Sequence, residues 1–148
     1  MSDRAVLEGF FAALNAHDVD AAMQAVGEGA TITVLPLEIE GAMASDGRGF
    51  LTALLRAFPD LRVRVDRMFV GSDGVGAVEG NLEGTQAAEF YGVINQEKHI
   101  DLDHAWRFAL RDGKIADCRL FWCQNQLYRR LAVKRLDNIT ITASGGAS

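Results

Sequence analysis

The chain has 148 residues, of which 49% are hydrophobic and 24% charged, the composition of an ordinary globular domain. A formal net charge of −5 disfavours a polyanionic partner such as nucleic acid. One hydrophobic core is sufficient at this length, so neither disulfide bonds nor a structural metal is required. No apolar run is long enough to span a membrane, no signal peptide is evident, and only two cysteines occur, so we expect a cytoplasmic protein.

The first half of the chain predicts three helices and a strand. Apolar residues at three- and four-residue steps indicate a helix from about Asp3 to Asn15. Asp18 can cap a second, short helix that ends near Val26, and Ser45 or Asp46 can cap a third that Pro59 stops. Gly27-Glu28-Gly29 breaks the second helix; the β-branched run over residues 30–35 then predicts a strand, and residues 37–45 a loop.

The second half predicts four consecutive antiparallel strands, because the apolar period changes from helical spacing to two. The expected strands are residues 61–70, 75–85, 98–110 and 115–123, with a hairpin turn at 71–74 and a loop over 87–97 that closes one end of the sheet. This order of elements favours an α+β fold in which helices pack on one face of a strongly bent sheet.

His104 is the one ionisable side chain on the inward face of the strand over residues 98–110. Its neighbours on that face are Ile100, Leu102, Trp106 and Phe108. Desolvation there would favour the neutral imidazole, which suits a base or a hydrogen-bond donor. A core histidine with a purely structural hydrogen bond is the alternative.

Four segments, in order, resemble the SnoaL-like polyketide cyclases of the nuclear-transport-factor-like, cystatin-like superfamily. They are residues 10–20 (FFAALNAHDVD), 58–63 (FPDLRV), 84–86 (GTQ) and 107–131, which includes DGKI at 112–115. The resemblance covers roughly residues 1–131. It implies a mainly antiparallel sheet curved into a cone-shaped barrel around an internal apolar pocket.

The resemblance also implies a function, a cofactor-independent cyclase acting on a hydrophobic polyketide-type intermediate in secondary-metabolite (antibiotic) biosynthesis. Cyclases of this type pair a histidine on the penultimate strand, matched here by His104, with an aspartate on the last strand. The aspartate positions hold Leu120 and Cys123 instead, so the usual aldol base is absent. A pericyclic closure, an isomerase or hydratase, and a non-catalytic ligand-binding dimeric module therefore stay open.

The predicted site combines catalytic and substrate-binding residues. We expect His104, Tyr91 and Glu79 to be catalytic, with Tyr91 in the capping loop and Glu79 as a replacement acid. The predicted substrate-binding residues are Trp106, Trp122, Cys118, Leu120, Phe11 and Met68. No zinc-ligand spacing or nucleotide fingerprint is present, so neither metal nor cofactor is expected.

Domain organisation and assembly follow from the same patterns. Residues 1–131 form one domain, and residues 132–148 form a C-terminal extension that we expect to be partly disordered. The convex face of a bent sheet is not covered by its helices, and exposed apolar surface there would favour a homodimer.

Overall fold

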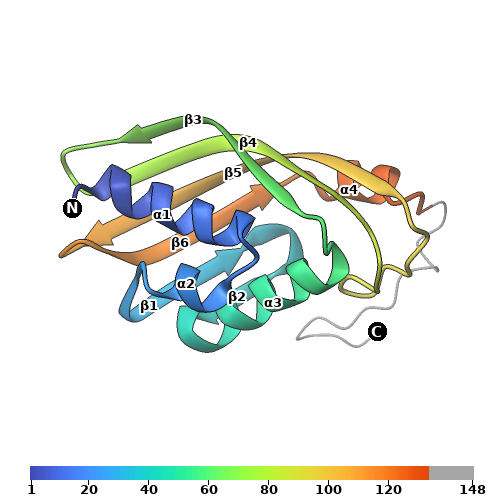
Figure 1. The fold of residues 1–148 in the computed structure, drawn as a ribbon, viewed down its shortest axis with the longest axis horizontal. Coiled ribbons are helices and arrows are strands. Elements are labelled where there is room, and N and C mark those ends of the chain that lie inside the picture. The colour runs from blue at the N-terminus through green and yellow to red at the C-terminus, as the bar shows by residue number, and fades with distance from the viewer. Residues whose placement is uncertain (134–148) are drawn as a thin grey trace.

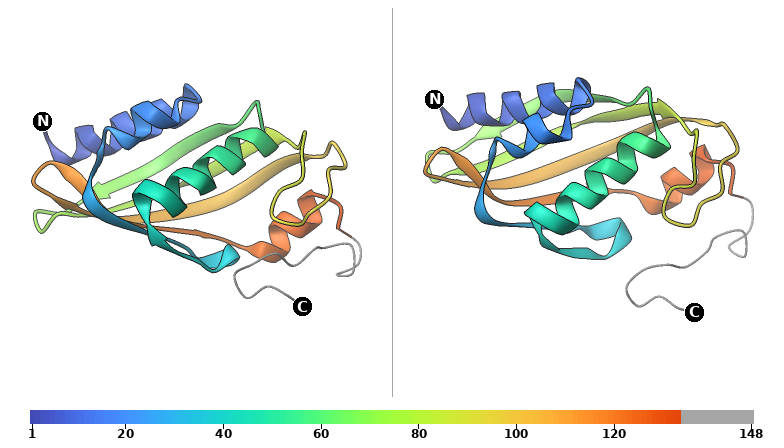
Figure 2. Two further views of the ribbon diagram at one scale, coloured as in Figure 1. Left: turned by 90° about the horizontal axis from the view of Figure 1, so that it is seen from below. Right: turned by 60° about the horizontal axis from the view of Figure 1, so that its bottom comes forward.

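The computed structural model describes residues 1–133, in which helices are layered on one curved sheet (Figure 1). Helices α1 (Asp3–Asn15), α2 (Val19–Met23) and α3 (Arg48–Ala57) lie on the same side of the sheet (Figure 2). The predicted α+β class is confirmed. No helix within residues 1–133 has the length and apolar character needed to cross a membrane.

Six strands within these residues form one mixed sheet in the order β2-β1-β6-β5-β4-β3. Their bounds are β1 (Val26–Val34), β2 (Ile39–Ala42), β3 (Arg62–Val70), β4 (Val75–Thr85), β5 (His99–Arg111) and β6 (Lys114–Trp122). β1 and β6 pair in parallel, and all other pairs are antiparallel. Because β2 and β3 are the two edges, the sheet is open, and the closed barrel is not formed.

Helix α1 begins and ends where its sequence pattern predicts. The Ser2 hydroxyl accepts a hydrogen bond from the Ala5 N–H at 3.1 Å, which satisfies one of the free amides of the first turn. The predicted apolar stripe faces the sheet and is fully buried; it consists of Val6, Leu7, Phe10, Phe11 and Leu14.

Residues 24–34 differ from the prediction. The second helix ends at Met23, and Val26 already begins β1, so Gly27-Glu28-Gly29 lies within a strand. Gly29 has φ +76°, and the pairing of β1 with β6 shifts register between Val26 and Thr31. An irregular strand of this kind is stabilised by pairing with neighbouring strands, here β2 and β6. The glycines in the local sequence do not reveal that pairing, so the prediction was wrong.

The predicted loop over residues 37–45 contains edge strand β2 and leads into a π-helical turn, Met43–Gly47. Neither Ser45 nor Asp46 caps α3, which has no side-chain cap. The Asp46 carboxylate instead accepts from the Ala42 N–H at 3.2 Å. The capping prediction was wrong because this inserted turn displaces the start of α3 to Arg48.

Helix α4 (Gln124–Arg130) was not predicted. It lies beside the part of β5 that extends past the end of β6. The Gln126 Oε1 accepts from the Asp103 N–H, and the Arg130 Nε donates to the Asp101 carbonyl, both at 3.2 Å. These side chains satisfy a strand edge that would otherwise be unpaired.

The convex face of the sheet carries mainly polar side chains along β5. The outward residues of β5 include His99, Asp101, Asp103, Arg107 and Arg111, all exposed. Two exposed large hydrophobic residues, Phe69 of β3 and Val75 of β4, lie near each other on this face, and the others in the described chain are Met1, Leu35 and Ile94. The apolar surface exposed on this face is small, and the homodimer stays a prediction. The predicted C-terminal extension lies outside the described residues from 134 onward.

Candidate functional site

His104 lies on the concave side of β5 and is only 5% exposed. Its Nε2 donates to the backbone carbonyl of Arg64 on β3 at 3.2 Å. Because a carbonyl can only accept, the proton of the neutral ring resides on Nε2 and Nδ1 carries a free lone pair. Nδ1 is buried and has no hydrogen-bond partner among the described residues.

The charge state of this imidazole is set mainly by burial, which lowers the pKa of His104 below 6.5. The bond to the Arg64 carbonyl and the carboxylates of Asp66 and Asp103 act in the opposite direction, and the Arg64 guanidinium lowers the pKa further. At neutral pH His104 is therefore an uncharged base with its lone pair available.

A glycine makes the His104 bond possible. Gly80 pairs with His104 on one side and with Val65 on the other. A Cβ at Gly80 would lie 1.8 Å from the Arg64 oxygen and 3.1 Å from the His104 Nε2. The β3 strand has a register shift between Val65 and Arg67, which brings this carbonyl over Gly80 to the imidazole.

Trp106, two residues further along β5, belongs to a cluster of aromatic rings. It is 2% exposed, and its ring centroid lies 6.4 Å from that of His104. Its other aromatic neighbours, 5.5–5.8 Å away, are Phe10, Phe11 and Phe108. The indole Nε1 is buried without a partner in the described chain, and a buried unpaired donor costs about 1–3 kcal/mol.

No carboxylate accompanies His104 on the concave side. The buried polar or charged side chains among residues 1–133 are Asn81, Gln86 and His104. Leu120, at one of the expected aspartate positions, is fully buried and pairs with Trp106 across β5 and β6. Cys123, at the other, is exposed and precedes α4. His104 is therefore the buried side chain of the described residues that can accept and release a proton near neutral pH.

Two predicted site residues, Tyr91 and Trp122, gather at one end of the sheet around Phe50 of α3. Phe50 stacks on Trp122 at 6.1 Å and contacts Tyr91 at 6.2 Å between ring centroids. Tyr91 is half-buried, and burial raises its pKa, so its hydroxyl is a neutral donor. The structure thus brings Tyr91 and Trp122 together, in a different cluster from Trp106.

Sequence reasoning assigned no role to three residues that shape this end. The Trp122 Nε1 donates to Gln124 at 2.7 Å, and the Gln124 Nε2 donates to the Tyr128 hydroxyl at 3.2 Å. The buried Gln86 donates to the Val93 carbonyl at 3.1 Å and fixes the loop that carries Tyr91. The sequence signal for Gln86 was the GTQ segment at residues 84–86, one of the four segments that carry the family resemblance.

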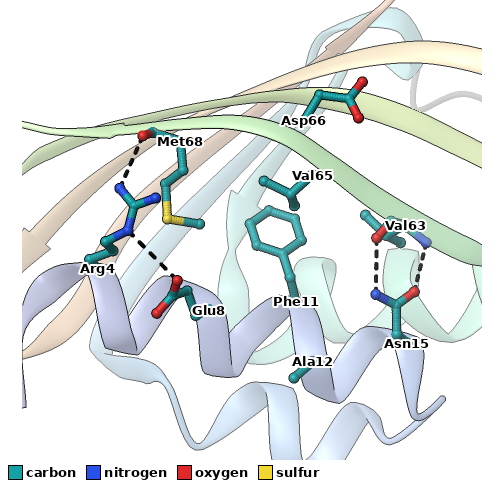
Figure 3. Close-up of a pocket in the computed structure, with 9 residues that line it drawn as sticks. All are labelled: Arg4, Glu8, Phe11, Ala12, Asn15, Val63, Val65, Asp66 and Met68. Atoms are coloured by element: carbon teal, nitrogen blue, oxygen red, sulfur yellow. Dashed lines mark hydrogen bonds and ion pairs between the residues drawn. The ribbon is translucent and has the colours of Figure 1, made fainter.

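Phe11 and Met68 line a groove of about 370 Å³ between α1 and β3 (Figure 3). At one end Arg4 binds the Met68 carbonyl and Glu8, and at the other the Asn15 side-chain amide pairs with both backbone groups of Val63. Between these ends the Phe11 ring projects from α1 toward β3. The complete lining is Arg4, Glu8, Phe11, Ala12, Asn15, Val63, Val65, Asp66 and Met68.

Glu79 alternates to the convex side of β4 and is exposed. It borders a hollow of about 270 Å³ whose lining also includes Asp66, Arg67, Asp103 and His104. Its carboxylate forms no ion pair within the described residues, whose carboxylate–cation contacts lie elsewhere. Glu79 thus faces the opposite side of the sheet from Trp106, at the rim of this hollow.

Cys118 is fully buried on β6, where its thiol contacts the Met43 sulfur at 3.8 Å. Burial, with a smaller contribution from Asp117, raises the pKa of Cys118 to about 12, so the thiol is neutral and unreactive. Cys118 and Leu120 pack as core residues. No cluster of three His, Cys, Asp or Glu side chains suited to a metal ion occurs in residues 1–133.

Helices packed on one face of a curved, open, mixed sheet define an α+β scaffold. The SnoaL-like domain model matches residues 7–118, and the chain belongs to this family. No curated protein matches the sequence.

Solved structures show the same fold at low identity. One from Jannaschia sp. CCS1, assigned as a SnoaL-like polyketide cyclase, has a TM-score of 0.78 and 20% identity, over 90% of this chain and 93% of that one. IdmH from Streptomyces antibioticus, assigned as a polyketide cyclase, has a TM-score of 0.77 and 18% identity, over 90% of this chain and 100% of that one. AclR from Streptomyces galilaeus, assigned as a hydroxylase, has a TM-score of 0.77 and 22% identity, over 88% of this chain and 80% of that one.

Proposed function

We propose that the chain is a cofactor-independent cyclase that closes a ring in a hydrophobic polyketide-type intermediate of secondary metabolism, with His104 as its acid and base. The observation that carries the proposal is the free, buried lone pair on the His104 Nδ1. Family membership and cyclase-assigned neighbours of the same fold support the reaction class.

In the proposed aldol reaction, Nδ1 removes the proton from a carbon next to a substrate carbonyl. The resulting enolate carbon attacks a second carbonyl of the same molecule, a carbon–carbon bond forms, and the new alkoxide takes the proton back from the imidazolium. No atom is gained or lost, so neither oxidant nor cofactor is needed. The bond from Nε2 to the Arg64 carbonyl stabilises the cationic ring between the two steps.

Holding the reactive ends together is the other expected contribution, because a well-oriented intramolecular reaction gains several kcal/mol from prepaid entropy. Tyr91 and Trp122, which meet around Phe50, are proposed to contact the substrate. Trp106, Phe11 and Met68 are proposed to contact it from the α1 side, whereas Cys118 and Leu120 would shape its surroundings from the core.

One observation favours a second candidate, a non-catalytic ligand-binding module. The two positions where related cyclases carry aspartate hold Leu120 and Cys123, and no carboxylate is buried near His104 in residues 1–133. The same scaffold would then bind an apolar ligand without transforming it.

Exchange of carbon-bound protons separates the two candidates. We expect the protein to accelerate hydrogen–deuterium exchange next to the carbonyl of 2-tetralone in D₂O, followed by proton NMR. His104→Gln should lower the exchange rate by about a hundredfold or more. His99→Gln, an exposed histidine on the same strand, is the matched control and should keep the parental rate.

Two outcomes would contradict the cyclase proposal. A folded His104→Gln protein that exchanges at the parental rate would remove His104 from the chemistry. A parental protein that binds 2-tetralone, measured by tryptophan fluorescence, but exchanges it no faster than buffer would favour the binding module.

A further inference from the structure

Two neighbouring side chains on the concave face of β5 each leave one buried nitrogen without a partner in the described chain. The His104 Nδ1 can only accept a hydrogen bond, because Nε2 carries the proton, and the Trp106 Nε1–H can only donate one. The two rings lie edge to face at 6.4 Å and 88°. A hydroxyl or enol, which accepts and donates through one oxygen, complements such a pair.

The groove between α1 and β3 approaches this pair from solvent. Phe11 lines the groove, and its ring also packs in T-shaped geometry against Trp106 at 5.5 Å between centroids. Figure 3 shows the ring standing between the Arg4 and Asn15 ends of the groove. Phe11 is therefore the residue shared by the groove and the ring cluster that contains the unpaired indole.

We propose that this groove leads to a binding site for an aromatic hydroxyl or enol, in which the Trp106 Nε1–H and the His104 Nδ1 hold one ligand oxygen and Phe11 is the movable wall. The inference rests on the proposed function in placing His104 against the ligand. It adds the Trp106 indole N–H as a ligand-binding group and the α1–β3 groove as the route of access.

The chemistry of the surroundings specifies the ligand class. Phe10, Phe11 and Phe108 surround Trp106 with ring faces and edges, which favours a flat aromatic ligand. A groove of about 370 Å³ falls within the size range of small-molecule sites. In a cyclase, such a ligand is the enol form of an aromatic ketone, which is also the species that Nδ1 would generate.

The test is a titration of ¹⁵N-labelled protein with 2-naphthol at pH 7, followed through the two indole N–H resonances. Trp122→Phe assigns them, and Trp122, which already donates to Gln124, is the internal reference. We expect the Trp106 resonance to move downfield by more than that of Trp122, whose N–H already has an acceptor. 2-Methoxynaphthalene accepts but cannot donate, so it should bind at least about tenfold more weakly.

Matched variants of α1 test the route. Ala12 is exposed and lines the groove, so Ala12→Phe should fill it and weaken 2-naphthol binding by about tenfold or more. Gly9→Phe places the same ring on α1 where a Cβ has no atom within 4 Å, and should bind like the parent. Phe11→Leu should change the affinity, whereas Phe58→Leu, a core ring that packs on Phe90 and lies outside the groove, should not.

An unmoved Trp106 resonance at saturating 2-naphthol would overturn the site, as would parental affinity in Ala12→Phe. Equal effects of Phe11→Leu and Phe58→Leu would overturn Phe11 as the wall. The titration needs no turnover, so it is independent of 2-tetralone exchange. If 2-naphthol binds but 2-tetralone exchange is not accelerated, the cyclase proposal is contradicted and the binding site stands. If 2-tetralone exchange is accelerated but 2-naphthol does not bind, the binding site is contradicted and the cyclase proposal stands.

Discussion

The imidazole of His104 is tied to the backbone of Arg64, 40 residues earlier, by a 3.2 Å hydrogen bond from Nε2. This one contact joins the central strand β5 to the edge strand β3 and leaves Nδ1 as the free nitrogen. The orientation and the tautomer of the His104 imidazole therefore depend on the register shift in β3 between Val65 and Arg67.

The first prediction concerns pH. Burial lowers the pKa of His104 in the folded chain below its unfolded value of about 6.5. As the pH falls below about 6.5, the unfolded chain takes up a proton at this histidine before the folded chain does. His104 therefore lowers the free energy of unfolding on acidification and has no such effect above about pH 7.5. Proton abstraction should fall in the same direction, at the folded pKa, because only the neutral ring is a base.

Urea unfolding of the parent and of His104→Gln at pH 5, 6, 7 and 8 isolates this contribution, since the other titrating groups are shared. The stability difference should shift in favour of His104→Gln as pH falls. A difference that is constant across the four pH values would mean that the imidazole is not desolvated.

Gly80→Ala should be strongly destabilising. The added Cβ would lie 1.8 Å from the Arg64 oxygen, so β3 has to move and the His104 bond is lost. We expect a loss of about 2–4 kcal/mol by chemical denaturation. Gly9→Ala adds a Cβ at an exposed position of helix α1, where no other atom lies within 4 Å. This change should instead raise the free energy of unfolding by about 0.5–1 kcal/mol. Comparable stabilities of the two variants would show that β3 does not pack over Gly80.

Much of the fold could be predicted from local pattern. The bounds of α1 and β4 were predicted as observed, and those of β3, β5 and β6 within one residue, because one face of each is buried and the apolar period is regular. The start of β1 and all of β2 were missed, since they form by pairing with distant strands. Helix α4 was missed because its role is to cover the edge of β5.

The candidate site was predictable in part. Alternation along β5 was enough to place His104 and Trp106 on the buried face. It could not reveal that the Arg64 carbonyl accepts a hydrogen bond from Nε2, because that contact depends on a register shift in another strand, β3. Nor could it separate Trp106, within the α1 cluster, from Trp122, which stacks on α3. Those differences arise from tertiary packing.

The two tryptophans should therefore respond differently to truncation. Trp106 is 2% exposed among four aromatic rings, so Trp106→Ala should cost about 3–5 kcal/mol of folding free energy. Trp122 is only partly buried, and Trp122→Ala should cost about 1–2 kcal/mol. Urea denaturation followed by circular dichroism measures both. Equal losses would place Trp122 in the core and weaken its proposed role as a ligand contact.

The cysteines offer a direct check on the packing of β6. Cys118 is fully buried against Met43, with a pKa raised to about 12, whereas Cys123 is exposed at the start of α4. Thiolate is the reactive form, so Ellman's reagent at pH 8 should titrate one thiol rapidly in the native protein and the second only in denaturant. Cys123→Ser should abolish the fast phase, and Cys118→Ser should leave it intact. A fast phase that survives in Cys123→Ser would mean that the β6 interior is open to solvent, and a ligand would then have access to Cys118 and Leu120 as well.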